Sequence, residues 1–405
     1  MTEAESIQLR DITEQDYEGR QIVAKSPKNL SVQARTTYRK EQDLEKDDSS
    51  TGDRLLYSLT LSKSLYHWGA LEANRQKGDL NLEIAELTTF ETYRNLALNI
   101  RSRYLAILVA KKEAELSRKN WERALDRLKL EQDRLESGAA SAIQVYNLEV
   151  SANSAELDLL KKENALEDQI DVLARLVGLP TESITSGLHS GIPEQAILSR
   201  EEIATLEQYF DEGVNNSPSI RSQAKSIESS EKDVHISSQR RKPKINLTAG
   251  ITQFEIDEIS RTRAEEIVYG GVSVNWNIFD GRATKGNKLS ALARVELLRR
   301  QFESAKATYQ FNLERSQRLL DLNSRILERE EKALNQASNY LRDTKSDFEA
   351  GRASPDDLEK VELSFASQDV RTQQARSEYY NALSSMASLL GFDGFAQKFI
   401  EIRSQ

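Results

Sequence analysis

Hydrophobic residues recur at helical spacing over two very long stretches of this chain. In residues 70–136 they are separated by threes, fours and their sums, with Arg, Lys and Glu between them. The positions that define this spacing are Leu80, Ile84, Leu87, Leu98, Leu105, Leu108 and Leu116. Proline breaks helix interiors, and none of the six prolines falls inside 70–136 or 283–349. The pattern predicts one helix over each range, roughly 100 Å long, and helices of this length are stable only when packed on neighbours.

A turn and a second helix follow each long helix. Gly138 and Gly351 supply the permissive backbone that the turns need. Residues Ser354–Asp357 are typical of a capped helix start, with a serine, a proline at the first helical position and an acid three residues after the serine. Return helices are predicted over 141–177 and 354–390.

Strict alternation of apolar and polar residues predicts two β-hairpins, over 29–65 and 244–279. The apolar positions are Leu30, Val32, Ala34, Tyr57, Leu59 and Leu61 in the first hairpin, and Ile245, Leu247, Ala249, Ile251, Val272, Val274, Trp276 and Ile278 in the second. Long hydrophilic loops, 41–53 and 255–266, are predicted between the strands of each hairpin.

The order of these elements repeats. A helix precedes each hairpin, over 3–25 and 217–241. Three pairs of landmarks share one offset of 213 residues, namely Leu65 and Ile278, Gly138 and Gly351, and Gly178 and Gly391. A constant offset is the signature of a duplicated structural unit.

The repeat divides the chain into four parts. We expect a first repeat at 1–178, a connection at 179–213, a second repeat at 214–391 and a tail at 392–405. Within the connection, a Gly, Ser and Thr-rich stretch is followed by a helix predicted over 194–213. The tail is expected to pack near this middle segment.

The composition favours long amphipathic helices over thick globular cores, because 30% of residues are charged and only 38% are hydrophobic. A net charge of −9 disfavours nucleic-acid binding. The absence of cysteine excludes disulfides and thiolate chemistry, and the histidines (His67, His189, His235) have no ligand spacing. No phosphate loop, nucleophile elbow or metal cluster is found. We therefore predict no enzyme, no catalytic residue, no cofactor and no metal site.

The first residues of this sequence do not have the pattern expected of an export signal. Residues 1–5 are acidic and lack a signal-peptide hydrophobic region, and no apolar run approaches the roughly 18–20 residues of a membrane helix. One helix fewer precedes the first hairpin than the second. We therefore expect either a cytosolic protein or a processed, trimmed or recombinant form of an exported one.

Four strands in one chain leave open edges and cannot close a barrel. Membrane barrels need about eight strands or more, so three chains would close a barrel of twelve with a polar lumen. Aromatic residues within or at the ends of the strands suit an interfacial girdle, namely Tyr57, Tyr66, Trp68, Tyr269, Trp276 and Phe279. A small soluble sheet packed on the helices is the alternative for the strands. A cytosolic coiled-coil scaffold is the alternative for the whole chain, but it explains neither the girdle aromatics nor the repeated turn glycines.

These features together resemble the outer membrane efflux proteins, the TolC family, over nearly the whole chain. The motifs that carry the resemblance are the hairpin exits 65–69 and 278–282, the Asn-Ser-Pro-Ser-Ile at 216–220, the turn motifs 135–141 and 348–354, and the leucine-glycine closures at Gly178 and Gly391. Each motif is weak alone, but their shared order and spacing make the resemblance strong.

The resemblance implies a homotrimeric channel-tunnel that is mainly α with a β-barrel part. Long antiparallel helices would form an α-helical barrel across the periplasm. Four strands per chain would contribute to a 12-stranded transmembrane β-barrel in contact with outer membrane lipid. The connection and tail would form an equatorial region. Such proteins are passive exit ducts that work with a periplasmic adaptor (membrane fusion) protein and an inner-membrane pump of the RND, ABC or MFS type.

The resemblance also assigns residues to the periplasmic end. The adaptor-contacting tips would be Gly138, Ala139, Ser141, Gly351, Ala353 and Ser354. The entrance, or gate, would involve Asp356, Asp357, Lys360, Phe348 and Arg352.

Two of these gate positions depart from the family pattern. A second acidic ring position falls on Lys360, which would weaken cation selectivity. The family's arginine partner of Phe348 falls on Ala353, although Arg352 is adjacent. Asp357 has an alternative role as the N-terminal cap of its helix, and the two roles are compatible.

Overall fold

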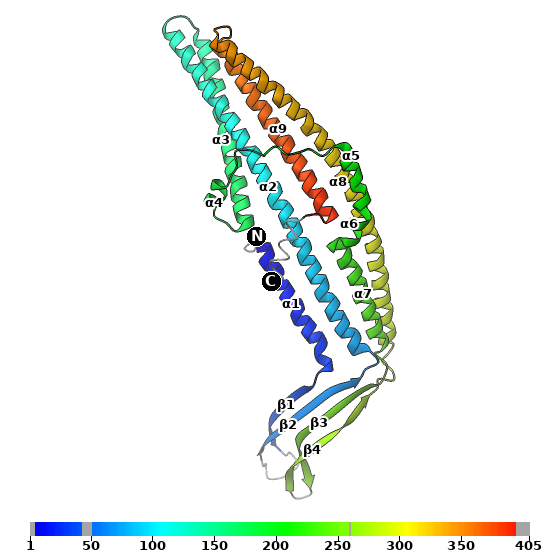
Figure 1. Cartoon of the computed structure of the whole chain (residues 1–405). Helices are drawn as coiled ribbons and strands as arrows, with labels where there is room; N and C mark the ends of the chain where they lie inside the picture. The colour runs from blue at the N-terminus through cyan, green and yellow to red at the C-terminus, as the bar shows by residue number, and fades with distance from the viewer. Residues whose placement is uncertain (1–4, 43–50, 259–260, 394–405) are drawn as a thin grey trace. The chain divides into compact units, whose positions relative to one another are not determined.

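The computed structural model describes residues 5–42, 51–258 and 261–393 (Figure 1). In chain order the elements are α1 (Glu5–Lys25), η1 (Ser26–Lys28), β1 (Ser31–Gln42), β2 (Thr51–Tyr66), α2 (Ala70–Glu136), α3 (Ala142–Val177), α4 (Thr181–Ser186), α5 (Arg200–Thr205), η2 (Leu206–Tyr209), α6 (Phe210–Asn216), α7 (Pro218–Ser238), β3 (Lys244–Glu258), β4 (Arg261–Asn275), α8 (Ala283–Glu349) and α9 (Pro355–Leu390). Helices dominate and the four strands form one sheet, so the predicted class, mainly α with a β part, is confirmed.

Corresponding helices of the two copies have equal lengths. α2 and α8 contain 67 residues each, and α3 and α9 contain 36 each. The bounds of all four helices are related by the same offset of 213 residues. The long helices begin and end where the sequence predicts, and the return helices begin one residue later. α3 and α9 each end at a left-handed glycine, Gly178 and Gly391.

The chain forms two compact units, and each takes residues from both copies of the repeat. Of the described residues, the helical unit comprises 5–11, 89–220 and 305–393. The strand unit comprises 12–42, 51–88, 221–258 and 261–304. The long helices α2 and α8 contribute to both units.

In the helical unit, α2 pairs with α3 and α8 pairs with α9 as antiparallel hairpins (Figure 1). Ile107 of α2 packs with Ile170, Leu173 and Val177 of α3 in one apolar cluster. On α8, three completely buried leucines are spaced by seven residues, at Leu313, Leu320 and Leu327. This heptad spacing is typical of coiled-coil seams.

The connection between the repeats corrects the prediction of a helix over 194–213. Residues 192–199 have no regular structure, and the helix starts only at Arg200. Ser199 begins it, because its side chain forms a capping box with Glu202. The helical stretch then continues through η2 and α6 as far as Asn216. A short helix, α4, also lies in the Gly, Ser and Thr-rich stretch.

Side chains of α9 explain why residues 192–199 do not form a helix. Gln373 accepts a hydrogen bond from the Ile192 amide at 2.7 Å, and Arg376 donates to the Ile192 carbonyl at 3.1 Å. The Leu198 amide donates to the hydroxyl of the fully buried Tyr379 at 2.9 Å. These backbone groups find partners in α9 instead of in a local helix, so tertiary contacts override propensity.

Only the start of the predicted tail lies within the described residues. The Phe392 ring meets the Tyr209 ring edge-on, with centroids 5.2 Å apart. This contact joins the beginning of the tail to the middle segment, as expected. Residues 394–405 lie outside the described residues.

In the strand unit, the four strands are antiparallel in the order β1-β2-β3-β4. Strand pairing corrects the prediction of a loop over 255–266, because β3 and β4 remain paired as far as Glu258 and Arg261. Backbone pairing does not require apolar side chains, so a polar sequence can still extend a ladder. The predicted loop 41–53 is also too long, because residues 41–42 belong to β1 and residues 51–53 to β2. Residues 43–50 lie outside the described residues.

Two helices accompany the long helices in the strand unit. Asn74 of α2 donates to the Ala24 carbonyl of α1 at 3.0 Å. Arg299 of α8 forms an ion pair with Glu231 of α7 at 2.7 Å. α1 therefore packs on the first turns of α2, whereas α7 contacts α8 further along that helix and also pairs with α2 through Asp233 and Lys77.

Candidate functional site

The two turns between the helices of each hairpin have the same geometry. Gly138 and Gly351 have φ angles of 78° and 72°, the left-handed region that favours glycine. The amide of Ala139 donates to the Arg134 carbonyl at 2.7 Å, and that of Arg352 to the Asp347 carbonyl, also at 2.7 Å. These two bonds are related by the repeat offset.

Asp357 caps helix α9. Its Oδ2 accepts from the Ser354 hydroxyl at 2.6 Å, and its own amide donates to the Ser354 hydroxyl at 3.2 Å. The hydrogen bonds from Ser354 hold the pKa of the Asp357 carboxyl below its usual value. Ser141 and Gln144 make the corresponding capping box at the start of α3. The alternative role given to Asp357, helix capping, is therefore present.

Asp356 is the acidic residue that bridges elements at this end. It pairs with Lys360 one turn along α9, and its Oδ1 accepts from Arg127 Nη2 of α2 at 2.6 Å. Hydrogen bonds from Lys360 and Arg127 lower the pKa of the Asp356 carboxyl. Within one chain, Lys360 therefore pairs with Asp356, the neighbour of Asp357.

A second ion pair lies one turn along the same two helices. Arg123 of α2 pairs with Glu359 of α9, and the arginine side chain is only 13% exposed. Arg123 and Arg127 are four residues apart, so they share one face of α2. We call the four residues Arg123, Arg127, Asp356 and Glu359 the interhelical ladder. It joins the first helical hairpin to the second.

Sequence reasoning missed three members of the ladder, Arg123, Arg127 and Glu359. The signal available was two arginines at helical spacing on one helix and two acids at similar spacing on another. Pairs of this kind are abundant in a chain with 30% charged residues. Which helices lie side by side is decided by tertiary packing.

Arg352, the arginine beside the predicted latch position of Phe348, pairs within its own turn. Arg352 donates to Asp347 Oδ1 through Nε at 2.9 Å and Nη2 at 2.5 Å. The arginine is therefore held by the residue next to Phe348. Phe348 itself remains 38% exposed at the turn.

One face of the sheet is apolar and exposed. Directly paired residues of antiparallel strands point to the same face, and the register aligns Leu59 with Ile251 and Ile251 with Val268. These three side chains are between 38% and 78% exposed. The neighbouring row, with Ser58 and Thr252, belongs to the opposite, polar face.

A β-bulge moves one girdle aromatic onto the apolar face. The register of β2 shifts between Ser64 and Tyr66, so that Tyr66 pairs with Ile245. Ile245 pairs in turn with Val274. Without the extra residue, Tyr66 would follow Ser64 onto the polar face.

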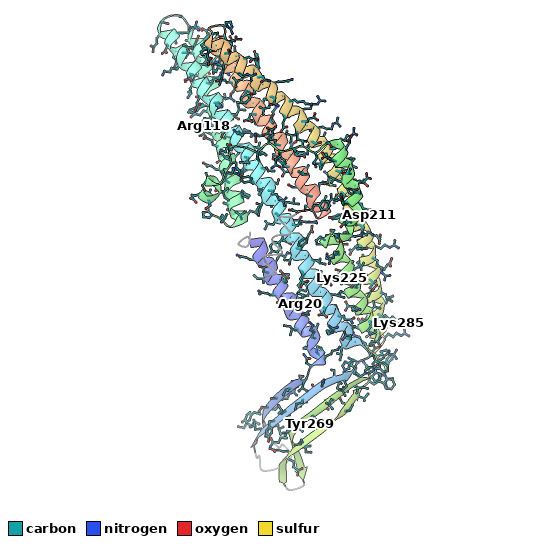
Figure 2. The ribbon with its side chains drawn as sticks, viewed as in Figure 1. Arg20, Arg118, Asp211, Lys225, Tyr269 and Lys285 are labelled. Carbon is teal, nitrogen blue, oxygen red and sulfur yellow. The ribbon has the colours of Figure 1, made fainter. Side chains whose placement is uncertain are left out.

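The register places Tyr269, one of the predicted girdle residues, on the polar face of the sheet. Tyr269 pairs with Gly250, which pairs with Thr60, so all three lie in a polar-face row. The Tyr269 hydroxyl lies 3.2 Å from the Thr60 hydroxyl. A Cβ on Gly250 would stand 3.1 Å from the tyrosine ring, so the ring covers the glycine. Figure 2 labels Tyr269 on the sheet.

The other girdle residues occupy two places. Tyr57 lies on the apolar face and donates to Glu266. Trp68, Trp276 and Phe279 follow the strands at the end of the sheet where the helices start, and all three are exposed.

The three comparisons with known proteins agree with this architecture. Within the described residues, no helix has a stretch long and apolar enough to cross a membrane. Long helical hairpins combined with an antiparallel sheet that exposes an apolar face define a channel-tunnel type of protein. The family model "Outer membrane efflux protein" matches residues 22–179 and 211–392. The chain belongs to this family.

Individual relatives are distant but cover most of the chain. The pyoverdine export outer membrane protein OpmQ of Pseudomonas aeruginosa is 22% identical over 343 residues, which are 83% of this chain and 71% of the relative. The outer membrane protein VceC of Vibrio cholerae has a TM-score of 0.68 at 17% identity, covering 96% of this chain and 93% of its own. The CmeC outer membrane channel of Campylobacter jejuni has a TM-score of 0.75 at 13% identity, covering 99% and 87%. At such identities the solved structures establish the fold.

The predicted family and the predicted general function are confirmed. The protein is an outer membrane efflux protein that serves as an exit duct. The alternative of a cytosolic coiled-coil scaffold is not supported. The relatives are channels rather than enzymes.

Proposed function

We propose that three copies of this chain assemble into one duct, with a twelve-stranded barrel in the outer membrane and the helices in the periplasm. The exposed apolar face of the sheet carries the proposal. Burying apolar surface contributes about 25 cal/mol per Å², so a face of this kind favours a lipid environment. The polar face would then line the lumen.

The edges of the sheet favour closure by other copies. β1 and β4 each have one neighbouring strand in the sheet of the described chain. Each therefore presents a row of backbone groups with no ladder partner, which cannot be tolerated in a bilayer. Pairing of β1 with β4 of the next copy satisfies both rows and closes the barrel.

Exposed apolar stripes on the helices also favour a trimer. On α3 the exposed side chains at helical spacing are Ile143, Tyr146, Val150, Leu157 and Leu160. On α8 they include Leu319, Leu322 and Ile326. Narrow stripes of this kind are coiled-coil seams without a partner. We assign them to contacts between α3 of one copy and α8 of the next.

The two repeats, 1–178 and 214–391, would each supply one helical hairpin and one strand hairpin of the wall. Residues 179–213 and 392–405 would form the equatorial part. The turns at Gly138 and Gly351 would be the periplasmic tips that meet an adaptor protein. An inner-membrane pump would supply the energy.

The entrance would be formed by the tips and the helix turns behind them. Asp356, Asp357 and Lys360 would ring it, with Phe348 and Arg352 at the turn. The interhelical ladder would hold the two hairpins of each copy together there. Because Lys360 pairs with Asp356, we expect weak cation selectivity.

Cysteine cross-linking tests the assembly, since the chain has no cysteine of its own. Ala34→Cys in β1 is combined with a cysteine scan of β4 from Ile267 to Gly271, and each pair is oxidised in outer membranes. One pair is expected to give a covalent trimer, and the single variants none. Purified trimers should conduct ions in planar phosphatidylcholine bilayers. The proposal fails if no β4 position cross-links and the protein, although folded, sediments as a monomer without conductance.

A further inference from the structure

In the part of the chain that the structure describes, the cations where the second hairpin meets its helices form no ion pair within 4.0 Å. The structure carries exposed basic side chains at Arg240, Arg241, Lys242, Arg282, Lys285 and Lys288, which we call the basic collar. Among the described residues, none of the six has a carboxylate oxygen within 4.0 Å. The one acid in these two segments, Asp280, accepts hydrogen bonds from the amide and the hydroxyl of Thr284, and the charge of Arg241 also lowers the pKa of its carboxyl.

The first copy of the repeat gives an internal comparison. Glu72 stands in the first turn of α2 and pairs with Lys28 and Arg75. The repeat offset places Lys285 where Glu72 stands, and Lys288 where Arg75 stands. The second copy therefore reverses the charge at one position and keeps it at the other.

Helix stability does not explain this reversal. The N-terminal end of a helix carries a partial positive charge, which favours acids and disfavours cations. The first turn of α8 has no acidic residue, whereas that of α2 has Glu72. Lys285 and Lys288, three residues apart on one side of α8, also repel each other. An anionic partner would offset both effects.

Contacts hold the collar against exposed aromatic residues. Trp276 Nε1 donates to the Arg241 carbonyl at 3.0 Å, and Arg241 donates to the Ile278 carbonyl at 2.9 Å. Lys242 Nζ lies 4.7 Å from the centre of the Trp68 ring, within cation–π range. The segment before β3 and the segment after β4 are therefore one surface.

This surface is apolar as well as basic. Trp276, Ile278 and Phe279 are between 60% and 75% exposed. They adjoin Arg282, which has a φ of 73°. Figure 2 labels Lys285 in the first turn of α8, close to the sheet. Exposed tryptophan and phenylalanine beside arginine and lysine are typical of a membrane–water interface.

We propose that the basic collar binds the headgroups of anionic phospholipids, with Trp276 and Phe279 inserted among the acyl chains beside them. The inference rests on the proposed function, because the sheet must lie in a bilayer for the collar to reach lipid phosphate. Charge complementarity selects an anionic headgroup. The exposed apolar side chains select a lipid over an acidic peptide or a free anion.

The test replaces Arg240, Lys285 and Lys288 by glutamine in the trimer, since none of these three side chains forms a hydrogen bond or an ion pair within the described residues. The matched control is Lys119→Gln, Lys129→Gln, Arg329→Gln, which removes the same charge from exposed helix positions. Energy transfer from tryptophan to dansyl-labelled phosphatidylglycerol is measured in detergent micelles at 0.1 M salt. Unlabelled phosphatidylglycerol or phosphatidylcholine serves as the competitor.

Each basic residue near an anionic surface contributes about 1 kcal/mol, or about fivefold in affinity. The collar variant should therefore lose on the order of 100-fold in apparent affinity for phosphatidylglycerol. The control variant should bind like the wild type, and phosphatidylcholine should not compete. The collar variant should keep the trimer size and helical circular dichroism of the wild type.

Three outcomes overturn the proposal. These are equal affinity of wild type and collar variant, full competition by inorganic phosphate, and full competition by poly-glutamate. Conductance in phosphatidylcholine bilayers is recorded in parallel and needs no anionic lipid. Normal conductance with unchanged lipid binding rejects the collar alone, whereas absent trimers and conductance reject the proposed function.

Discussion

A charge introduced at the middle of β4 tests whether the sheet faces a membrane or water. Val268 is the central residue of β4 and is 78% exposed on the apolar face. Its neighbour Ile267 lies on the polar face and is 40% exposed. Val268→Arg and Ile267→Arg introduce the same charge one residue apart. Only the environment of the two faces differs.

The free-energy cost expected for each substitution follows from the face on which the residue lies. In water, a substitution at so exposed a position costs within about 0.5 kcal/mol of zero. In a bilayer, an arginine at mid-depth costs about 2–4 kcal/mol, and the lost transfer of valine adds about 1–2 kcal/mol. Three copies in one barrel would lose on the order of 10 kcal/mol. Ile267→Arg should leave folding almost unchanged and shift ion selectivity towards anions.

Refolding from urea into phosphatidylcholine vesicles measures the effect. The folded trimer fraction is read from protease resistance and from gel mobility without heating, and selectivity from the reversal potential in planar bilayers. Val268→Arg should fold poorly and Ile267→Arg like the wild type. If Val268→Arg folds normally, or if Ile267→Arg is the damaging variant, the assignment of the faces is refuted.

Three further predictions concern the helices. Tyr379→Phe should destabilise the protein by about 1–3 kcal/mol, because the part-buried Leu198 amide loses its acceptor. Tyr380→Phe, whose hydroxyl is more accessible, should cost less, and thermal unfolding of both variants decides. Gly351→Ala should lower the free energy of unfolding by about 1–2 kcal/mol, because alanine disfavours a positive φ. Gly286→Ala should raise it by up to about 1 kcal/mol, since a Cβ there meets no atom within 4 Å. Equal shifts of the melting temperature in the two variants would contradict this prediction. Hydrogen bonds from Arg75 and, to a smaller extent, from Lys28 lower the pKa of Glu72 to about 2. The ionised Glu72 therefore stabilises the folded protein fully at a pH above its usual pKa of 4.5, and this contribution disappears as the pH falls towards about 2. Glu72→Gln should therefore lose less stability than the wild type over that range, and superimposable pH profiles of the melting temperature would reject this role.

Local signals in the sequence were enough for most of the fold. The bounds of α2 and α8 follow from apolar spacing, the lack of proline and the turn glycines. Gly178 and Gly391 end the return helices because a left-handed residue is needed there. These determinants act within a few residues, so they can be recognised without knowing the partners of a helix. Because the unit is duplicated, each of these local patterns occurs twice in the chain.

The candidate site was predicted only in part. The capping role of Asp357 could be predicted from the sequence, because it depends on Ser354, only three residues away. The partners of Asp356 were not, because Arg127 is 229 residues distant in the chain. Pairing over such distances depends on which helices pack together.

Register and long-range contacts were decided by the tertiary structure. Alternation alone cannot detect the bulge that turns Tyr66, nor can it assign Tyr269 to the row of Gly250 and Thr60. The segment from 192 to 199 has a sequence compatible with helix, but Gln373 and its neighbours on α9 bind its backbone instead. The sequence by itself thus determined the elements, because their signals are local. The tertiary structure decided which faces and charges meet, because those choices depend on residues far apart in the chain.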